Sequence, residues 1–235
     1  MNVRWAALAC DYDGTLADHG RVRPATLAAL RRLRQSRRKL LLVTGRELAE
    51  LSAIFPSLEL FDRVIAENGA IIYDSASRQR RLLAGPPPRE FVDALRARRI
   101  EPLSIGQAIV ATVRGHQHEV SEVIHHLGLP LQVILNKRSL MVLPRGVDKA
   151  RGLVEALGEI GVAPADTVGI GDAENDAGFL ALCGYSAVVA NALPMLKRKV
   201  NEVTSAAFGA GVVELANHLL NGGSFPGFRH RSLAH

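Results

Sequence analysis

The chain has 235 residues, of which 48% are hydrophobic and 22% charged. This composition is typical of one compact or two small globular domains and excludes fibrous, collagenous and disordered proteins. The formal net charge is +6, because 29 lysines and arginines outnumber 23 aspartates and glutamates. The basic residues cluster at 31–39, 78–81, 96–99 and 197–199 without interleaved aromatic residues, which favours solvated surfaces over nucleic-acid contacts. The two cysteines match no zinc or redox spacing. No apolar run is long enough for a membrane span. From these two observations we expect a cytoplasmic protein.

The first part of the chain alternates between short apolar runs and helical patterns. Trp5–Cys10 has the length of a strand. Pro24 then opens a helix with leucines at helical spacing, since proline is favoured in a first helical turn. The same rules predict, in order, a strand at Lys39–Val43, a helix to about Phe55, a strand at Arg63–Ala66 and, after the turn signal Asn68-Gly69, a hairpin strand at Ala70–Tyr73.

A break follows at Gly85 and the prolines of 86–88. Beyond it the pattern changes from strand-helix alternation to a mixed order. The predicted elements are a helix at Arg89–Arg99, a strand at Ile105–Val113, a helix at Gln117–Leu127 and strands at Leu131–Leu135 and Leu140–Leu143. We therefore expect a small inserted α+β unit over residues 84–145.

After Pro144 the strand-helix alternation resumes. The predicted elements are a helix at Lys149–Ile160, a strand at Thr167–Ile170, a helix at Asn175–Leu182, a strand at Ser186–Val189 and a helix at about Gly211–Leu220. Together the two outer parts, 1–83 and 146–220, predict an α/β fold with a doubly wound parallel sheet, interrupted by the inserted unit. We expect residues 221–235, which are glycine-rich and polar at their start, to form a flexible tail.

Polar side chains follow three of the predicted parallel strands, at the point where each strand ends. Asp11 and Asp13 follow the first strand, Thr44 follows the second, and Asp172 and Asp176 follow the strand that ends at residue 170. Ligands of open parallel sheets bind at this edge. Four carboxylates that converge there would repel one another without a cation, and the hard, oxygen-preferring Mg²⁺ is the expected ion.

Carboxylates with Mg²⁺ suit phosphoryl transfer, in which negative charges must be brought together. An ionised Asp11 would serve as nucleophile and split hydrolysis into two easier steps. Asp13 would donate a proton to the leaving oxygen and later take one from water. Gly14 and Thr15 would supply a tight turn and donors for phosphate oxygens.

The sequence resembles the haloacid dehalogenase (HAD) superfamily of phosphotransferases at four segments in the right order. The segments are Asp-Tyr-Asp-Gly-Thr-Leu at 11–16, Thr-Gly-Arg at 44–46, Lys149 and Gly-Asp-Ala-Glu-Asn-Asp at 171–176. Three further segments, at 66–70, 143–149 and 190–192, resemble the Cof-type branch, in which a cap is inserted between the second and third motifs. The resemblance implies a Rossmann-like HAD core and a small α+β cap, and it covers nearly the whole chain except the tail and the cap interior.

The resemblance implies a role for each matching position. Asp11 would be nucleophile and Mg²⁺ ligand, and Asp13 the general acid and base with its backbone carbonyl on the metal. Asp172 would be a further metal ligand, and Asp176 would support the metal directly or through water.

For the phosphoryl group, the resemblance implies hydrogen bonds from Thr44 and neutralisation by Lys149. Gly45, Arg46 and Asn175 are further expected phosphate contacts. Asn68 lies in a family segment near the cleft, with a role that is either functional or structural.

The predicted function is that of a Mg²⁺-dependent phosphatase acting on a small phosphorylated metabolite through an aspartyl-phosphate. The cap would close over the cleft, exclude water and supply specificity. Its cations, among them Arg114, Lys137 and Arg138, would bind a second anionic group, so phosphoglycolate or a phosphoglycerate is a candidate substrate beside sugar phosphates. The expected cap is shorter than that of the branch's larger sugar phosphatases, and Phe179 stands where many relatives have methionine.

Two alternatives remain open from the sequence. A phosphomutase would return the phosphoryl group to a sugar and uses the same motifs. A non-catalytic module that binds nucleic acid or a protein partner would keep the fold, and steep salt dependence of binding would reveal it. We expect a small phosphorylated metabolite as ligand, with neither nucleic acid nor membrane as partner; the sequence predicts no oligomeric state.

Overall fold

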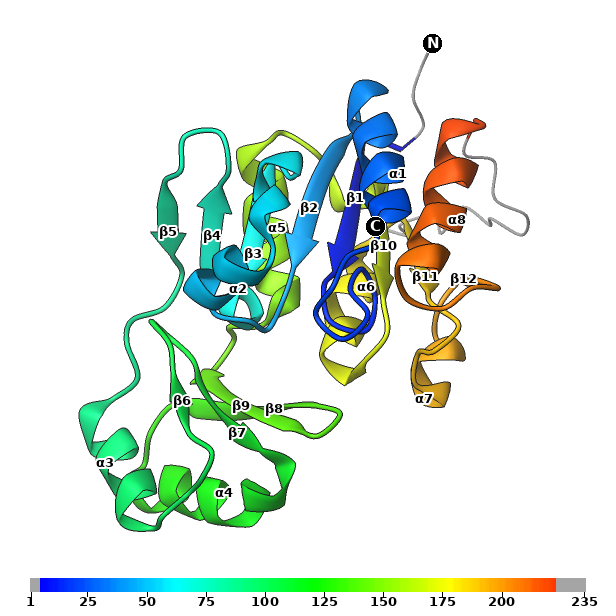
Figure 1. Cartoon of the computed structure of the whole chain (residues 1–235). Helices are drawn as coiled ribbons and strands as arrows, with labels where there is room; N and C mark the ends of the chain where they lie inside the picture. The colour runs from blue at the N-terminus through cyan, green and yellow to red at the C-terminus, as the bar shows by residue number, and fades with distance from the viewer. Residues whose placement is uncertain (1–4, 223–235) are drawn as a thin grey trace, which may run out of the picture.

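The computed structural model describes residues 5–222 (Figure 1). Within this range the chain forms an eight-stranded sheet and a separate four-stranded sheet. The expected flexible tail lies outside the described residues from position 223 onward.

The large sheet has the strand order β12-β11-β10-β1-β2-β3-β4-β5. Its strands are β1 Ala7–Asp11, β2 Lys39–Val43, β3 Arg63–Ala66, β4 Ile71–Asp74, β5 Arg80–Leu82, β10 Thr167–Gly171, β11 Tyr185–Val188 and β12 Glu202–Val203. The six strands from β12 to β3 are parallel, and β4 and β5 are antiparallel additions at one edge. The prediction of a doubly wound, mainly parallel sheet is confirmed.

Helices cover both faces of the large sheet (Figure 1). They are α1 Pro24–Gln35, α2 Leu48–Ile54, α5 Lys149–Glu159, α6 Ala177–Leu182, α7 Pro194–Lys197 and α8 Phe208–Leu220. Helices α1 and α8 pack together on one face, and α5 and α6 pack together on the other. No helix in residues 5–222 combines the length and apolarity needed to cross a bilayer.

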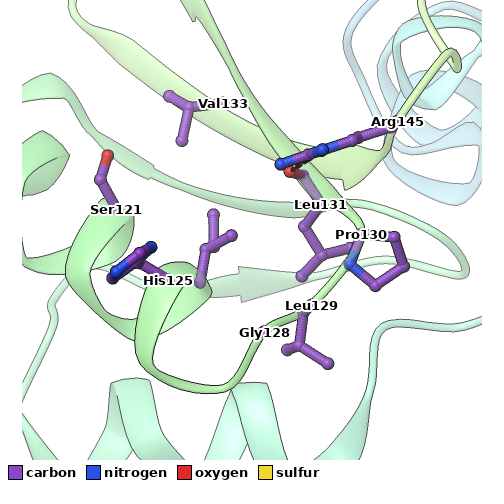
Figure 2. A pocket seen from close by; sticks show the side chains of 9 residues that line it. Ser121, His125, Gly128, Leu129, Pro130, Leu131, Val133 and Arg145 are labelled. Carbon is purple, nitrogen blue, oxygen red and sulfur yellow. Dashed lines mark hydrogen bonds between the residues drawn. The ribbon is translucent and has the colours of Figure 1, made fainter.

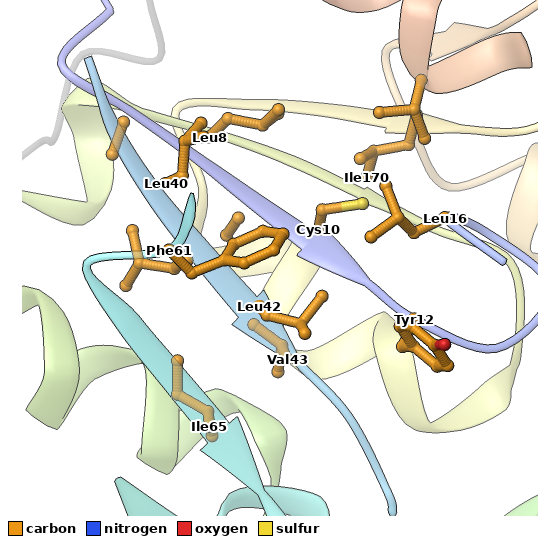
Figure 3. Packing of buried hydrophobic residues seen from close by; sticks show 14 of the residues in the cluster. Leu8, Cys10, Tyr12, Leu16, Leu40, Leu42, Val43, Phe61, Ile65 and Ile170 are labelled. Carbon is orange, nitrogen blue, oxygen red and sulfur yellow. The ribbon is translucent and has the colours of Figure 1, made fainter. Parts of the chain in front are cut away.

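The core explains why the central strands are continuous apolar runs. Strands covered on both faces have no solvent side, so hydrophobic residues do not alternate with polar ones. All five residues of β1 and the last four of β2 are buried. Figure 3 shows Leu8, Cys10, Leu40 and Leu42 of these strands packed with Phe61 in this core.

The inserted residues 89–144, which we call the smaller layer, form the four-stranded sheet β6-β7-β9-β8 and two helices. The elements are α3 Arg89–Ala97, β6 Ser104–Ile105, β7 Val110–Val113, α4 Gln117–His126, β8 Leu131–Asn136 and β9 Ser139–Pro144. Side chains alternate between the two faces of the sheet along β9. Leu140 and Val142 pack in a cluster with residues of α3 and α4. Met141 and Leu143 pack in a different cluster, which includes Ala70, the residue directly before β4 of the large sheet. One face of this sheet therefore packs on its own helices, and the other is turned toward the large sheet.

The prediction of one strand over 105–113 was wrong, because the structure has two strands separated by a turn. The amides of Gln107, Ala108 and Ile109 in this turn donate to the carboxylate of Glu67. These bonds take the place of strand pairing in the turn. The short edge strands β5 and β12 were not predicted either.

Candidate active site

Three buried carboxylates meet at the carboxyl edge of the large sheet. Asp11 is the last residue of β1, Asp172 follows the adjacent parallel strand β10, and Asp176 lies one turn further on. Each offers an oxygen within 4.8 Å of the others, and among residues 5–222 this is the one such group of metal-ligand type. Their exposed fractions are 4%, 0% and 0%. The predicted convergence at this edge is thus observed for these three residues.

Lys149 lies between two of these carboxylates. Its Nζ donates to Asp11 Oδ1 at 2.5 Å and to Asp176 Oδ1 at 2.7 Å, and the residue is 1% exposed. Burial alone lowers the pKa of Lys149, but the charges of Asp11 and Asp176 raise it more, so the net shift is upward. The ammonium is therefore held in its charged form.

The hairpin turn between β3 and β4 helps to place Lys149 at the start of α5. Asp148 caps this helix by accepting the Arg151 amide at 2.9 Å. A Cβ on Gly69 would lie 1.9 Å from the Asp148 carbonyl oxygen, and Gly69 has a φ of +105°. The Asn-Gly turn at 68–69 therefore permits a backbone approach that a larger residue would block.

Excess negative charge remains at the site. Burial, and next the negative charge of Asp176, raises the pKa of Asp11 well above its ordinary value, although Lys149 opposes this. Burial likewise raises the pKa of Asp172, against the opposing effect of Lys137. Both upward shifts have the direction expected of buried carboxylates with like-charged neighbours.

The hydrogen bonds of Asp11 and Asp176 differ. Asp176 Oδ2 accepts the amides of Asp172 at 2.8 Å and Ala173 at 2.9 Å, so both of its oxygens are engaged. Asp11 Oδ2 is buried and, among the described residues, accepts no hydrogen bond. Asp11 therefore has an oxygen left for a ligand, whereas Asp176 is fitted to hold its neighbours in place.

Asp13 does not join the group of carboxylates. Its oxygens are bound by Arg46, with Nε to Oδ2 at 2.6 Å and Nη2 to Oδ1 at 2.8 Å. The guanidinium also contacts Glu50 and lies 5.8 Å from the centre of the Tyr12 ring. Of the four carboxylates expected to converge, three form the compact group, and the carboxylate of Asp13 forms a two-pronged ion pair with Arg46.

Thr44, Asn68 and Asn175 form a polar cluster beside the carboxylates. Thr44 is buried, and its carbonyl accepts the Asn68 amide at 2.9 Å. Asn175 Nδ2 donates to Asn68 Oδ1 at 2.9 Å. This leaves Asn68 Nδ2 and Asn175 Oδ1 buried without a partner in the part of the chain described. These two side chains therefore retain hydrogen-bonding capacity that a ligand's polar atoms could use.

The smaller layer contributes two side chains to this region. Lys137, at the tip of the β8–β9 hairpin, contacts Asp172 Oδ2 with its Nζ, and its amide donates to Glu174 at 2.9 Å. Met141 lies over Gly45, where a Cβ would be 3.1 Å from its Sδ. The sequence indicated Lys137 as a candidate site residue but not Met141. Met141 stands in an apolar run with leucines and a valine, a pattern typical of a core strand.

A separate pocket lies on the far side of the smaller layer (Figure 2). It lies between α4 and β8, where Leu129, Pro130 and Leu131 form an apolar wall beside His125 and Arg145. None of the predicted site residues lines it. The chemistry expected from the sequence belongs to the sheet edge, not to this pocket.

Comparison with known proteins agrees with this geometry. A sequence profile of haloacid dehalogenase-like hydrolases matches residues 8–97 and 131–215. The phosphoglycolate phosphatase of Aeropyrum pernix is 29% identical over 96% of this chain and 97% of its own length. That of Methanopyrus kandleri is 30% identical over 89% of this chain and 95% of its own.

A solved structure gives the same picture of the fold. The crystal structure of a haloacid dehalogenase-like hydrolase from Bacteroides thetaiotaomicron superposes with a TM-score of 0.78 at 19% identity, over 92% of this chain and 99% of the other. The fold therefore extends over both sheets and is shared at low sequence identity.

Proposed function

The chain belongs to the haloacid dehalogenase-like hydrolase family, and from this premise we propose that it is a Mg²⁺-dependent phosphatase of small phosphorylated metabolites. The observation that carries the proposal is the state of Asp11. One of its oxygens is fixed by Lys149, while the other is buried and unpartnered among the described residues. A carboxylate oriented on one side and open on the other is suited to attack phosphorus.

In the first step an Asp11 oxygen attacks the phosphoryl group. The new O–P bond forms as the bond between phosphorus and the leaving oxygen breaks, and Asp13 gives a proton to that oxygen. Lys149 neutralises charge on the nucleophile and on the transferring group. Thr44, Asn175 and the Gly45-Arg46 segment would bind the phosphoryl oxygens.

In the second step water hydrolyses the aspartyl-phosphate. Asp13 takes a proton from water, the water oxygen bonds to phosphorus, and the bond to Asp11 breaks to release inorganic phosphate. Asp13 must leave Arg46 to perform both transfers, because the bonds from this guanidinium occupy both of its oxygens.

The donor set at the site fits Mg²⁺. Three carboxylates offer hard oxygen ligands, among them the Asp11 oxygen that does not attack phosphorus. Asp11, Asp172 and the Asp13 backbone carbonyl would hold the ion, and Asp176, whose oxygens are already engaged, would support them. When bound, the ion would supply positive charge that offsets the carboxylates and the negative charge of the phosphoryl group.

The substrate class follows from the cations of the smaller layer. We assign residues 84–145 as a cap over a catalytic core formed by 1–83 and 146–220. Lys137 at its hairpin tip, with the adjacent Arg138 and with Arg114, whose guanidinium donates to the Lys137 carbonyl, would bind a carboxylate on the leaving group. Relatives named phosphoglycolate phosphatase support a short, carboxylate-bearing substrate.

The test is phosphate release from a panel of substrates by the full chain. The panel contains 2-phosphoglycolate, 3-phosphoglycerate and glucose 6-phosphate, each with Mg²⁺ and with EDTA. We expect Mg²⁺-dependent release that is fastest for a carboxylate-bearing substrate. Conversion of a sugar phosphate into its isomer without phosphate release would replace hydrolysis by a mutase reaction, and no turnover of any substrate would contradict the proposal.

A further inference from the structure

Glu67 is a buried acid outside the carboxylate group at the sheet edge. It is 1% exposed and lies in the turn between β3 and β4, directly before Asn68. Its carboxylate accepts three amides of the smaller layer, from Gln107 at 3.0 Å, Ala108 at 2.7 Å and Ile109 at 3.1 Å. Burial of a carboxylate is costly unless it is hydrogen-bonded, and here its bonds come from the other sheet unit.

The partner segment is shaped to receive this carboxylate. Successive backbone amides that point at one acceptor form an anion-binding concavity. A Cβ on Gly106 would lie 2.8 Å from Glu67 Cδ, so the absence of a side chain there allows the close approach. Glu67 itself has a φ of +47°, and its amide donates to the Arg46 carbonyl at 2.9 Å. Glu67 is thus fixed through both its backbone amide and its carboxylate.

The contact is continuous with the part of the smaller layer that lies over the site. The turn that binds Glu67 runs directly into β7, in which Ala111 pairs with Met141 of β9. Met141 in turn lies over Gly45, beside Asn175. The 106–109 turn is thus connected through β7 and β9 to Met141 at the Gly45 segment.

We propose that Glu67 is a positioning residue that holds the smaller layer over the active site, with Met141 against Gly45, and so limits the room for the leaving group. The kinetic consequence rests on the proposed phosphatase function; the structural consequence does not. With the contact intact the space suits a short leaving group. With it broken, discrimination against bulky leaving groups falls.

The direct test is amide hydrogen exchange of the full chain, followed by mass spectrometry of peptides that span 104–113. In Glu67→Gln an NH₂ group replaces one acceptor oxygen, so we expect exchange of the turn amides to accelerate about tenfold or more, as befits the loss of charge-assisted hydrogen bonds. The matched control is Glu47→Gln. Glu47 contacts Ser104 of the same layer at an exposed position, where an amide serves equally well, and exchange should stay as in the unmodified protein.

A second variant approaches the same contact from the opposite side. Gly106→Ala places a methyl group against the Glu67 carboxylate and keeps the charge, whereas Gly115→Ala, with no atom within 4 Å of its new Cβ, is its control. Gly106→Ala should reproduce the faster exchange, and Gly115→Ala should not. Turn exchange within twofold of the unmodified protein in both Glu67→Gln and Gly106→Ala would overturn the proposal.

Kinetics then test the consequence for the reaction. Both contact variants should raise KM for 2-phosphoglycolate about tenfold and change kcat/KM for the bulkier p-nitrophenyl phosphate less than threefold, since weaker closure removes contacts to the short substrate only. An equal loss for both substrates would refute the positioning role. If the unmodified protein hydrolyses neither substrate, the proposed function fails, and the exchange experiment still decides whether Glu67 holds the layer.

Discussion

The two ends of the large sheet both carry clusters of opposite charges, and the clusters differ in burial and in completeness. At the amino ends of the strands, Arg63 pairs with Asp74 at 3.0 Å and Glu159 at 2.7 Å, and Lys39 pairs with Asp62 at 2.9 Å. These side chains are 16–45% exposed. At the carboxyl ends, Lys149 and its partners are at most 5% exposed, and Asp11 retains an unpartnered oxygen among the described residues.

The difference in burial distinguishes charged residues with a structural role from those suited to a catalytic role. Exposed ion pairs are inexpensive and contribute little to stability. Buried charges require compensation by partners of opposite charge. A buried charge that is incompletely paired lowers the stability of the ligand-free fold. Of the two clusters compared, the one at the carboxyl edge bears this cost, which is the pattern expected of an active site.

The largest effect should come from Asp11→Asn. The change removes the nucleophile with almost no change of volume, so we expect turnover to fall by about a thousandfold or more while circular dichroism stays that of the folded protein. Asp62→Asn, the same change at the amino edge, should leave the rate within twofold. Comparable rates for the two variants would erase the distinction between the edges.

Lys149→Met should affect both activity and stability. Removing one partner of a buried ion pair leaves Asp11 and Asp176 uncompensated, and we expect the free energy of unfolding in urea to fall by about 3 kcal/mol. Lys39→Met breaks an exposed pair and should cost less than about 1 kcal/mol. A loss at Lys149 as small as that at Lys39 would contradict the view that burial makes these charges interdependent.

Lys137→Met tests how the smaller layer adds to the carboxyl edge. If its ammonium binds the substrate's carboxylate, kcat/KM for 2-phosphoglycolate should fall about tenfold or more, whereas a phosphate ester with an uncharged leaving group should lose less than threefold. Arg89→Met changes an exposed arginine of the same layer and is the control. Equal losses for both substrates would assign Lys137 to the metal site instead.

The smallest effect should come from Arg81→Gln. Arg81 pairs with Glu155 at 3.1 Å and Glu159 at 2.9 Å at the surface of α5. We expect a loss of less than about 1 kcal/mol in urea unfolding and an unchanged rate of phosphate release. A larger change in rate would show that the far side of α5 communicates with Lys149 at its start.

Most of the fold could be predicted because its central strands are unmistakable. Lys39–Val43 and Thr167–Ile170 are apolar runs between helical patterns, and the structure has strands at both places. The missed strands, Arg80–Leu82 and Glu202–Val203, are short edge strands with exposed or half-buried charged residues and no apolar pattern. Pairing with a neighbour, which local sequence does not encode, creates them.

The site residues could be predicted to the extent that they follow strands. Asp11, Asp172 and Asp176 meet as the strand order requires. The pairing of Asp13 with Arg46 depends on side-chain conformation, which the position of Asp13 after a strand does not determine. The contact of Glu67 was invisible because its partners are backbone amides about 40 residues later, which carry no side-chain signature. Its one sequence signal is an acid between the apolar runs of β3 and β4.

The most direct test of the central claim is to find phosphate on the enzyme. The full chain is mixed with 2-phosphoglycolate and Mg²⁺, quenched in acid within milliseconds, digested and analysed by mass spectrometry. The proposed mechanism predicts a phosphate on the peptide that contains Asp11, absent from Asp11→Asn. Phosphate on a different side chain, or hydrolysis by Asp11→Asn at the unmodified rate, would contradict it.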